Sequence, residues 1–255
     1  MPKIWMLAFF ALFFLPFITL HADEIELHAD EWCPYNCEAN SEHEGYLIDL
    51  ARAIFTQHGH TVTYVTTPWA RALKMTQKKE HVGAPGAYIG NGEGLIFHRN
   101  TAGHSVNSFV VLKSSNWRYT GRDSLEGHTI AVIKDYTYGE PVDTYLKENK
   151  KDVIWLHGDS PLKSALQLLV RRRVTAVLDD KNVLKELIRS QGLSDVVKTA
   201  GEIEGGENVY IAFSPQGKKG KLYAKQFSDG IADFRADGRL DKILGKYGID
   251  DWIER

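Results

Sequence analysis

The feature that most constrains this sequence is a regular alternation of strand-like and helix-like segments. Strand patterns at residues 24–29 and 61–65 enclose a segment, residues 45–55, whose apolar side chains recur at helical spacing. A second series begins with the strand-like residues 128–135 and continues through another strand pattern at 174–180. Strands that alternate with helices predict mostly parallel sheets flanked by helices, so two separate series predict two α/β units.

The first 22 residues differ from everything after them. Lys3 precedes an apolar run from Ile4 to Leu20 that contains five phenylalanines, and the chain then turns polar. This pattern predicts a secretory signal peptide cleaved after Ala22, and hence a periplasmic protein. An uncleaved membrane anchor is the alternative, because an apolar run of about 17 residues is at the short limit for a membrane span.

Composition narrows the class of partner. With 43% hydrophobic and 25% charged residues, the chain resembles soluble globular proteins. Its 31 Lys plus Arg against 33 Asp plus Glu give a formal net charge of −2. A large nucleic-acid footprint needs clustered basic residues, and the basic runs here are short and scattered, so we expect no nucleic-acid partner.

Both cysteines, Cys33 and Cys37, lie in one short segment, EWCPYNCE. In an oxidising compartment two close cysteines usually pair, and a tight disulfide loop would fix the geometry of Tyr35 and Asn36. A zinc site is one alternative, but the histidines lack the paired spacing of a zinc motif. A catalytic dithiol is another, although it normally has a two-residue spacer. We therefore expect a disulfide, with no metal and no cofactor.

Several segments together resemble one known family, the periplasmic solute-binding proteins that include the polar amino-acid receptors of ABC transporters (family 3, type II). The segments that carry the resemblance are WCPYN, GYLIDLARAIF, PWARAL, HTIAVIKDYTYG, GDSPLKSALQLLVRRRVTAVLDD and IADFRADGRLDKILGKYGIDDW. The match extends over essentially the whole chain after the signal segment. Their order and spacing are more specific than any one of them.

The resemblance implies an α/β fold of two lobes, each a mostly parallel sheet flanked by helices, joined by two crossing strands. Lobe one would comprise residues 23–112 plus 213–255, and lobe two residues 113–212. Such lobes close over a small ligand by a hinge motion, here expected near Leu112 and near Ala212.

In lobe one the resemblance implies four cleft residues. Tyr35 corresponds to the aromatic residue that covers the ligand, with a core aromatic as the alternative. Trp69 begins the helix after the second strand, where an indole supplies apolar area and a face for a cation. Arg71, on the same turn, could hold a carboxylate bidentately or be a solvated side chain. Tyr88 faces the cleft by its position.

In lobe two the resemblance implies two further contacts. Thr137, in DYTYG, corresponds to a hydroxyl residue at the start of a helix, where backbone N–H groups also attract anions. Asp180, at the end of VTAVLDD, corresponds to the acid that receives a ligand amine. Its neighbour Asp179 could be the helix cap.

One departure from the family pattern bears on the ligand. Amino-acid receptors of this family usually carry a Thr-x-x-Arg motif after the third strand, whose arginine holds the ligand carboxylate. The corresponding stretch AYIGNGEGLIF has Gly92 and Glu93 instead, and Arg99 falls several residues too late. Either Arg71 supplies the carboxylate contact, or the ligand is a different molecule, cationic or less charged.

We therefore expect a monomeric binding protein for a small polar solute, an amino acid or related amine, with an inner-membrane ABC permease as its partner. A ligand-sensing module for a membrane signalling protein would use the same fold. A periplasmic dehydratase or lyase is the enzyme alternative, because related folds occur among such enzymes. It would need an acid or base beside the substrate. The nearest candidates, Glu93 and His98, are expected to be loop residues.

Overall fold

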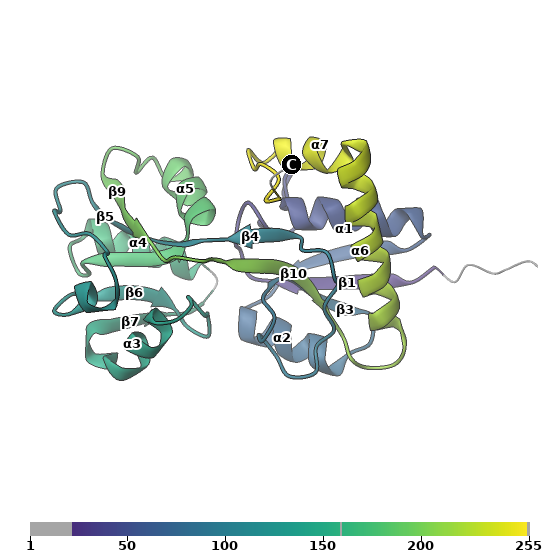
Figure 1. Cartoon of the computed structure of the whole chain (residues 1–255), viewed down its shortest axis with the longest axis horizontal. Coiled ribbons are helices and arrows are strands. Elements are labelled where there is room, and N and C mark those ends of the chain that lie inside the picture. The colour runs from purple at the N-terminus through teal and green to yellow at the C-terminus, as the bar shows by residue number, and fades with distance from the viewer. Residues whose placement is uncertain (1–21, 159, 254–255) are drawn as a thin grey trace, which may run out of the picture.

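The computed structural model describes residues 22–158 and 160–253. The described chain forms two α/β lobes, which lie side by side along the long axis and are bridged by extended segments (Figure 1). This confirms the two-lobe α/β fold. The predicted signal peptide falls on residues that lie outside the described part, except for Ala22 at its expected end. Among the described helices, none is long and apolar enough to cross a membrane.

Lobe one contains a five-stranded sheet in the order β2-β1-β3-β10-β4. Its first three strands are parallel, and β10 runs antiparallel to both of its neighbours. Helices α1, α6 and α7 pack together, and α2 covers the other side of the sheet (Figure 1). The bounds of these elements are β1 Glu24–Ala29, α1 Tyr46–Gln57, β2 Thr61–Thr66, α2 Trp69–Lys78, β3 Val82–Ala87, β4 Gly103–Ser105, β10 Glu207–Phe213, α6 Lys219–Asp237 and α7 Arg239–Gly245.

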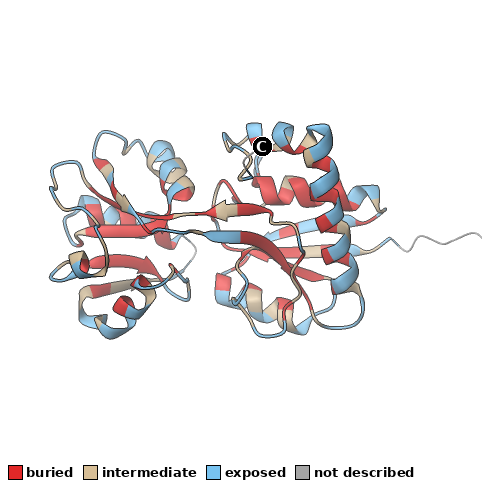
Figure 2. Cartoon of the chain, viewed as in Figure 1, coloured by how far each residue is buried: buried red, intermediate tan, exposed pale blue. Residues whose placement is uncertain are grey.

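Lobe two repeats this plan with a sheet in the order β7-β6-β8-β5-β9. Strands β6, β7 and β8 are parallel, and β5 is antiparallel to β8 and β9. In both lobes the central strands are largely buried, the edge strands β2 and β9 are partly exposed, and the helices expose their outer faces (Figure 2). The bounds are β5 Asn107–Leu112, η1 Arg122–Leu125, β6 Ile130–Ile133, α3 Val142–Glu148, η2 Lys150–Asp152, β7 Val153–Leu156, α4 Pro161–Val170, β8 Ala176–Asp180, α5 Lys181–Ser190 and β9 Val197–Glu202.

The chain passes from one sheet to the other at earlier residues than the expected lobe boundaries after residues 112 and 212. Only Val106 separates β4 of lobe one from β5 of lobe two, and residues 203–206 separate β9 from β10. Residues 107–112 therefore belong to the sheet of lobe two, and residues 207–212 to that of lobe one. The first crossing lies within almost continuous strand sequence, where an apolar pattern cannot indicate which sheet a residue joins. The second crossing has the sequence IEGG, between β9 and β10. We propose lobe boundaries at Val106 and at residues 203–206.

Local sequence explains the helices that frame the space between the lobes. Leu47, Leu50 and Ile54 give α1 a buried face that packs against α6. The side chain of Asp180 caps α5 by accepting hydrogen bonds from the backbone N–H groups of Asn182 and Val183, at 2.8 and 3.0 Å. The cap is therefore Asp180, and the alternative that assigned it to the preceding acid is wrong.

The contact between α1 and α6 gives a test of the packing in lobe one. A Cβ atom at Gly230 would lie 2.5 Å from Cγ2 of Ile54. We expect Gly230→Ala to lower the free energy of unfolding by about 1–3 kcal/mol, because the core must shift to admit it. Gly245→Ala is the matched control, since a Cβ there has nothing within 4 Å. Urea unfolding of both variants measures this effect, and equal stabilities would contradict the packing described.

Candidate functional site

A cavity of about 30 Å³ lies between the lobes. Most of its lining residues lie at or just after the carboxyl ends of β1, β3, β6 and β8, where open α/β sheets bind their ligands. The lining residues are Asp30, Trp32, Asn36, Trp69, Pro85, Gly86, Tyr88, Asn91, Asn107, Tyr136, Thr137 and Asp179. A buried water needs roughly 10–15 Å³ of space measured in the same way, so the cavity has room for about two water molecules.

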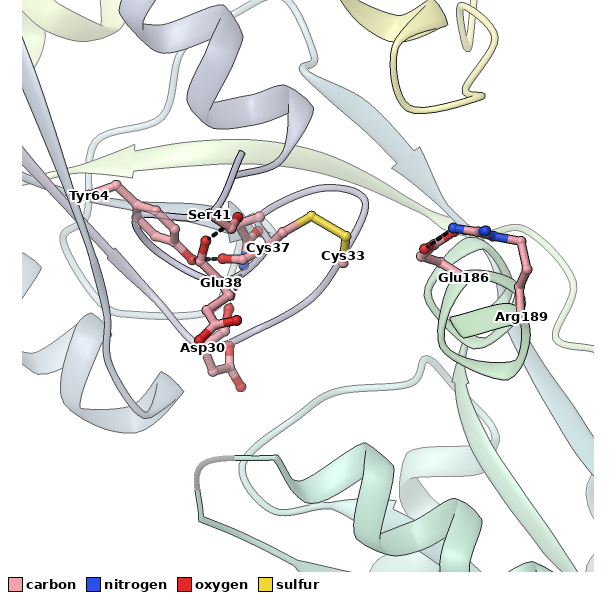
Figure 3. Close-up of a disulfide and its surroundings, with 9 residues drawn as sticks. Asp30, Cys33, Cys37, Glu38, Ser41, Tyr64, Glu186 and Arg189 are labelled. Carbon is pink, nitrogen blue, oxygen red and sulfur yellow. Dashed lines mark hydrogen bonds and ion pairs between the residues drawn. A yellow bond between two sulfur atoms is a disulfide. The ribbon is translucent and has the colours of Figure 1, made fainter. Parts of the chain in front are cut away.

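The disulfide loop after β1 builds one wall of the cavity. Cys33 and Cys37 are bonded, which confirms the predicted pair. Within the loop the N–H of Trp32 donates to the carbonyl of Asn36 at 2.7 Å, and the amide of Asn36 donates to the carbonyl of Asp30 at 2.7 Å. Figure 3 shows the loop in lobe one facing helix α5 of lobe two across a groove. The disulfide thus holds two lining side chains in place.

Two reciprocal hydrogen bonds connect the lobes across the cavity. Trp32 of lobe one donates its indole N–H to Oδ1 of Asp179 in lobe two, at 3.0 Å. Tyr136 of lobe two donates its hydroxyl to Oδ2 of Asp30 in lobe one, at 2.7 Å. Each lobe therefore supplies one carboxylate and one aromatic donor. These bonds hold the lobes in the closed arrangement.

The electrostatics of the cavity are one-sided. Asp30 and Asp179 are both buried, and none of the described residues that line the cavity is basic. Burial raises the pKa of Asp179 to about 7, although hydrogen bonds from Trp32 and from the backbone oppose this shift. Burial likewise raises the pKa of Asp30 to about 6. The closed cavity thus disfavours the ionised forms of its own carboxylates.

Two polar atoms of the cavity residues have no hydrogen-bond partner. They are Oδ2 of Asp179 and Oδ1 of Asn36, and both are buried. A buried acceptor left without a donor is costly, so such atoms call for an explanation. Both are acceptors, and a donor in the cavity would satisfy them.

Three of the six expected cleft residues line the cavity, namely Trp69, Tyr88 and Thr137. The other three are not among its lining residues. Tyr35 stacks on Trp32, with ring centroids 4.1 Å apart. Arg71 is exposed on α2.

The third, Asp180, is buried at the crossing between the lobes. Its Oδ2 accepts hydrogen bonds from Ser105 at 2.8 Å, from the N–H of Val106 at 3.2 Å and from the hydroxyl of Tyr35 at 3.2 Å. Its Oδ1 caps α5. Asp180 therefore has a structural role, and its neighbour Asp179 supplies the carboxylate of the cavity.

Several lining residues were missed by the sequence analysis. Asp30 and Trp32 follow β1 directly, and Tyr136 follows β6, so their positions after strands were the available signal. The choice between Asp179 and Asp180 had no such signal. Asn91 lies in the stretch after β3 where the family usually carries its arginine, and Asn107 begins β5, but the sequence analysis named neither residue.

The residues named for an enzyme lie elsewhere. His98 is buried, donates from Nδ1 to the carbonyl of Asn100 at 2.6 Å and accepts from the N–H of Ile211 at 2.9 Å. Burial lowers its pKa to about 4, so both ring nitrogens serve the packing of lobe one as a neutral imidazole. Glu93 is exposed. In the part of the chain that the structure describes, no group of three or more His, Cys, Asp or Glu side chains could hold a metal ion.

Comparison with known proteins identifies the family and supports the two-lobe fold. The family model of the bacterial extracellular solute-binding proteins, family 3, matches residues 27–250. No curated protein matches the chain in sequence. Among solved structures, a histidine kinase sensor domain with similarity to periplasmic binding proteins has 21% identity and a TM-score of 0.72, covering 88% of this chain and 95% of that one.

Two further structures are similar in fold. A mutant of ArgBP from T. maritima has 18% identity and a TM-score of 0.71, with 88% of this chain and 94% of that chain covered. A structure concerned with glutathione import via GshT and the cystine ABC importer TcyBC of Streptococcus mutans has 18% identity and a TM-score of 0.73, with 89% and 95% covered. At these identities the likeness establishes the fold. The fold and the matching family are those of binding proteins rather than enzymes.

The raised pKa of Asp179 gives a test of the site. A carboxyl whose pKa is higher in the folded than in the unfolded state stabilises the fold below its unfolded pKa, and this stability is lost as pH rises through about 7. Asn keeps the Oδ1 acceptor and cannot ionise. When the pH rises from 5 to 8, the free energy of unfolding of wild type should therefore fall by ~1–2 kcal/mol more than that of Asp179→Asn.

Urea unfolding at the two pH values measures this difference. The matched control is Asp195→Asn, which removes an exposed carboxylate of lobe two. The stability of that variant should follow the wild-type pH profile. A parallel profile for Asp179→Asn as well would show that the carboxyl is not buried in the closed protein.

Proposed function

We propose that this chain, which belongs to the family 3 bacterial extracellular solute-binding proteins, captures a small polar solute between its lobes and presents it to a membrane partner. The observation that carries the proposal is the cavity itself. It lies where the carboxyl ends of the strands of both sheets meet, and both lobes supply lining side chains. A solute bound there contacts both lobes and therefore favours their closure.

The partner follows from the family and from the fold neighbours. One neighbour concerns import through an ABC importer and another is a sensor domain of a histidine kinase. We propose delivery to an inner-membrane ABC permease, with a sensor as the alternative. The hydrophobic segment before Ala22 and the extracellular family support a location in the periplasm after cleavage of that segment. We expect the protein to act as a monomer.

Closure requires motion at the two crossings. The cavity of about 30 Å³ is too small to admit an amino acid or amine from solution while the lobes are closed. Val106 and residues 203–206 are the only described links between the two sheets along the chain. A hinge at these segments would separate Trp32 from Asp179 and Tyr136 from Asp30, and so open the cavity.

In the closed state we propose that Trp69 and Tyr88 of lobe one contact the solute together with Thr137 of lobe two. The rings of Trp69 and Tyr88 supply apolar area, and the hydroxyl of Thr137 can donate or accept a hydrogen bond. Asp30 and Asp179 supply the charges of the site.

This function is tested by a ligand screen on protein stripped by unfolding in urea and refolding, with the disulfide intact. The panel contains amino acids, amines and sugars, and stabilising compounds are followed by X-ray solution scattering. A compound at 100 times its Kd should raise stability by about 2.7 kcal/mol and should reduce the radius of gyration.

Trp69→Ala should weaken this effect, because Trp69 lines the cavity. Trp155→Ala is the matched control, since Trp155 packs against the lobe-two core and lies outside the lining. Stabilisation without compaction, or no stabilising compound in the panel, would contradict solute capture by lobe closure.

A further inference from the structure

We infer that the cavity between the lobes selects an organic cation that carries no carboxylate, such as an aliphatic amine or a guanidinium compound. This inference rests on the proposed function, because it specifies the class of solute that the same site binds. It is carried by the charges, the unpartnered atoms and the rings of the cavity lining.

The first step concerns charge. Asp30 comes from lobe one and Asp179 from lobe two, so a bound solute lies between two buried carboxylates. None of the described lining residues is an arginine, a lysine or a histidine. A carboxylate group of the solute would be buried beside two like charges with no basic partner, which is strongly unfavourable at low dielectric. A cation there is favoured by both charges.

The second step concerns the unpartnered atoms. Oδ2 of Asp179 and Oδ1 of Asn36 are buried acceptors without a donor, on the two sides of the cavity. An ammonium or guanidinium group carries several N–H donors and no acceptor. It can satisfy both oxygens, and the bond to a carboxylate is of the strong, charge-assisted kind. A solute carboxylate can satisfy neither oxygen.

The third step concerns the rings. Trp32, Trp69, Tyr88 and Tyr136 all contribute to the lining. Aromatic faces attract cations, most strongly where water is excluded, and tryptophan is the best of the three aromatic types. The same rings bury the aliphatic part of an amine. The remaining polar lining comes from Asn36, Asn91, Asn107 and Thr137, which are neutral.

The fourth step concerns Arg71, the residue expected to hold a solute carboxylate. It is exposed on α2 and does not line the cavity, whereas Trp69 on the same helix does. The stretch after β3, where amino-acid receptors of the family carry their arginine, has Gly92 and Glu93. Neither α2 nor the stretch after β3 therefore supplies an arginine that could hold a solute carboxylate in the cavity.

Proton binding by the two cavity carboxylates is consistent with a cationic solute. The polar and charged groups that face Asp179 are Trp32, Asp180, Asp30 and Tyr138. Those that face Asp30 are Tyr136, Glu31 and Tyr64. None of these groups is a cation. Burial raises the pKa of Asp179 to about 7 and that of Asp30 to about 6. Without a solute, closure thus favours proton uptake. A cation replaces these protons, so its affinity should increase from pH 6 to pH 8.

The test uses three pairs of compounds that differ only in the carboxylate: agmatine with L-arginine, cadaverine with L-lysine, and putrescine with L-ornithine. Calorimetry is done at pH 8 on the stripped protein with its disulfide intact. In at least one pair the decarboxylated member should bind tenfold or more tightly than its amino acid. Asp179→Asn should weaken that binding by tenfold or more, and Asp30→Asn should weaken it as well. Asp195→Asn, an exposed carboxylate, should leave it unchanged.

The outcomes separate this inference from the proposed function. If an amino acid binds as tightly as its amine or more tightly, and the lobes compact, the cation inference is overturned and solute capture stands. If a neutral solute is the most tightly bound ligand, the cation inference is likewise overturned and solute capture stands. If none of the three amines binds, the inference is overturned as well. If an amine binds equally well to wild type and both cavity variants, the assignment of Asp30 and Asp179 is wrong.

Discussion

The closed arrangement depends on two adjacent carboxylates at the end of β8 that have different roles. Successive side chains of a strand point to opposite faces, so Asp179 and Asp180 cannot both face the cavity. Asp180 caps α5 and accepts hydrogen bonds from Ser105 and Val106, where the chain crosses between the lobes. Asp179 faces the cavity and is bonded to Trp32 of the other lobe. One dipeptide therefore connects the crossing between the lobes, a helix and the cavity.

Asp30 and Asp179 make closure dependent on what occupies the cavity. Each carboxylate accepts a hydrogen bond from an aromatic residue of the opposite lobe, which holds the lobes together. The same closure removes both carboxylates from water, and removing an ion from water is unfavourable unless it is paired. Tyr136 and Trp32 donate hydrogen bonds without supplying positive charge. A cationic solute supplies that charge, so it favours the closed state more than a neutral one does.

Much of the fold was predictable because it follows from local patterns. The alternation of strands and helices predicted two α/β lobes, and the close cysteines predicted the Cys33–Cys37 disulfide. The site was only partly predictable, because it depends on how side chains from distant segments are oriented. Three of the residues expected from family position, Trp69, Tyr88 and Thr137, line the cavity. Family position could not show that Asp180 accepts hydrogen bonds at the crossing between the lobes, or that Trp32 stacks on Tyr35. The crossings that we propose lie earlier than the expected ones, because β5 and β10 each join one sheet and a strand pattern alone does not indicate which sheet that is.

The central claim is that the buried carboxylate of Asp179, whose Oδ2 has no hydrogen-bond donor, binds a positively charged group of the solute. A crystal structure of the complex with the most tightly binding compound of the screen tests this claim most directly. The account predicts closed lobes, a cationic nitrogen about 3 Å from Oδ2 of Asp179, and aromatic rings around it. A solute whose carboxylate lies in the cavity, or one that leaves Oδ2 of Asp179 without a donor, would contradict it.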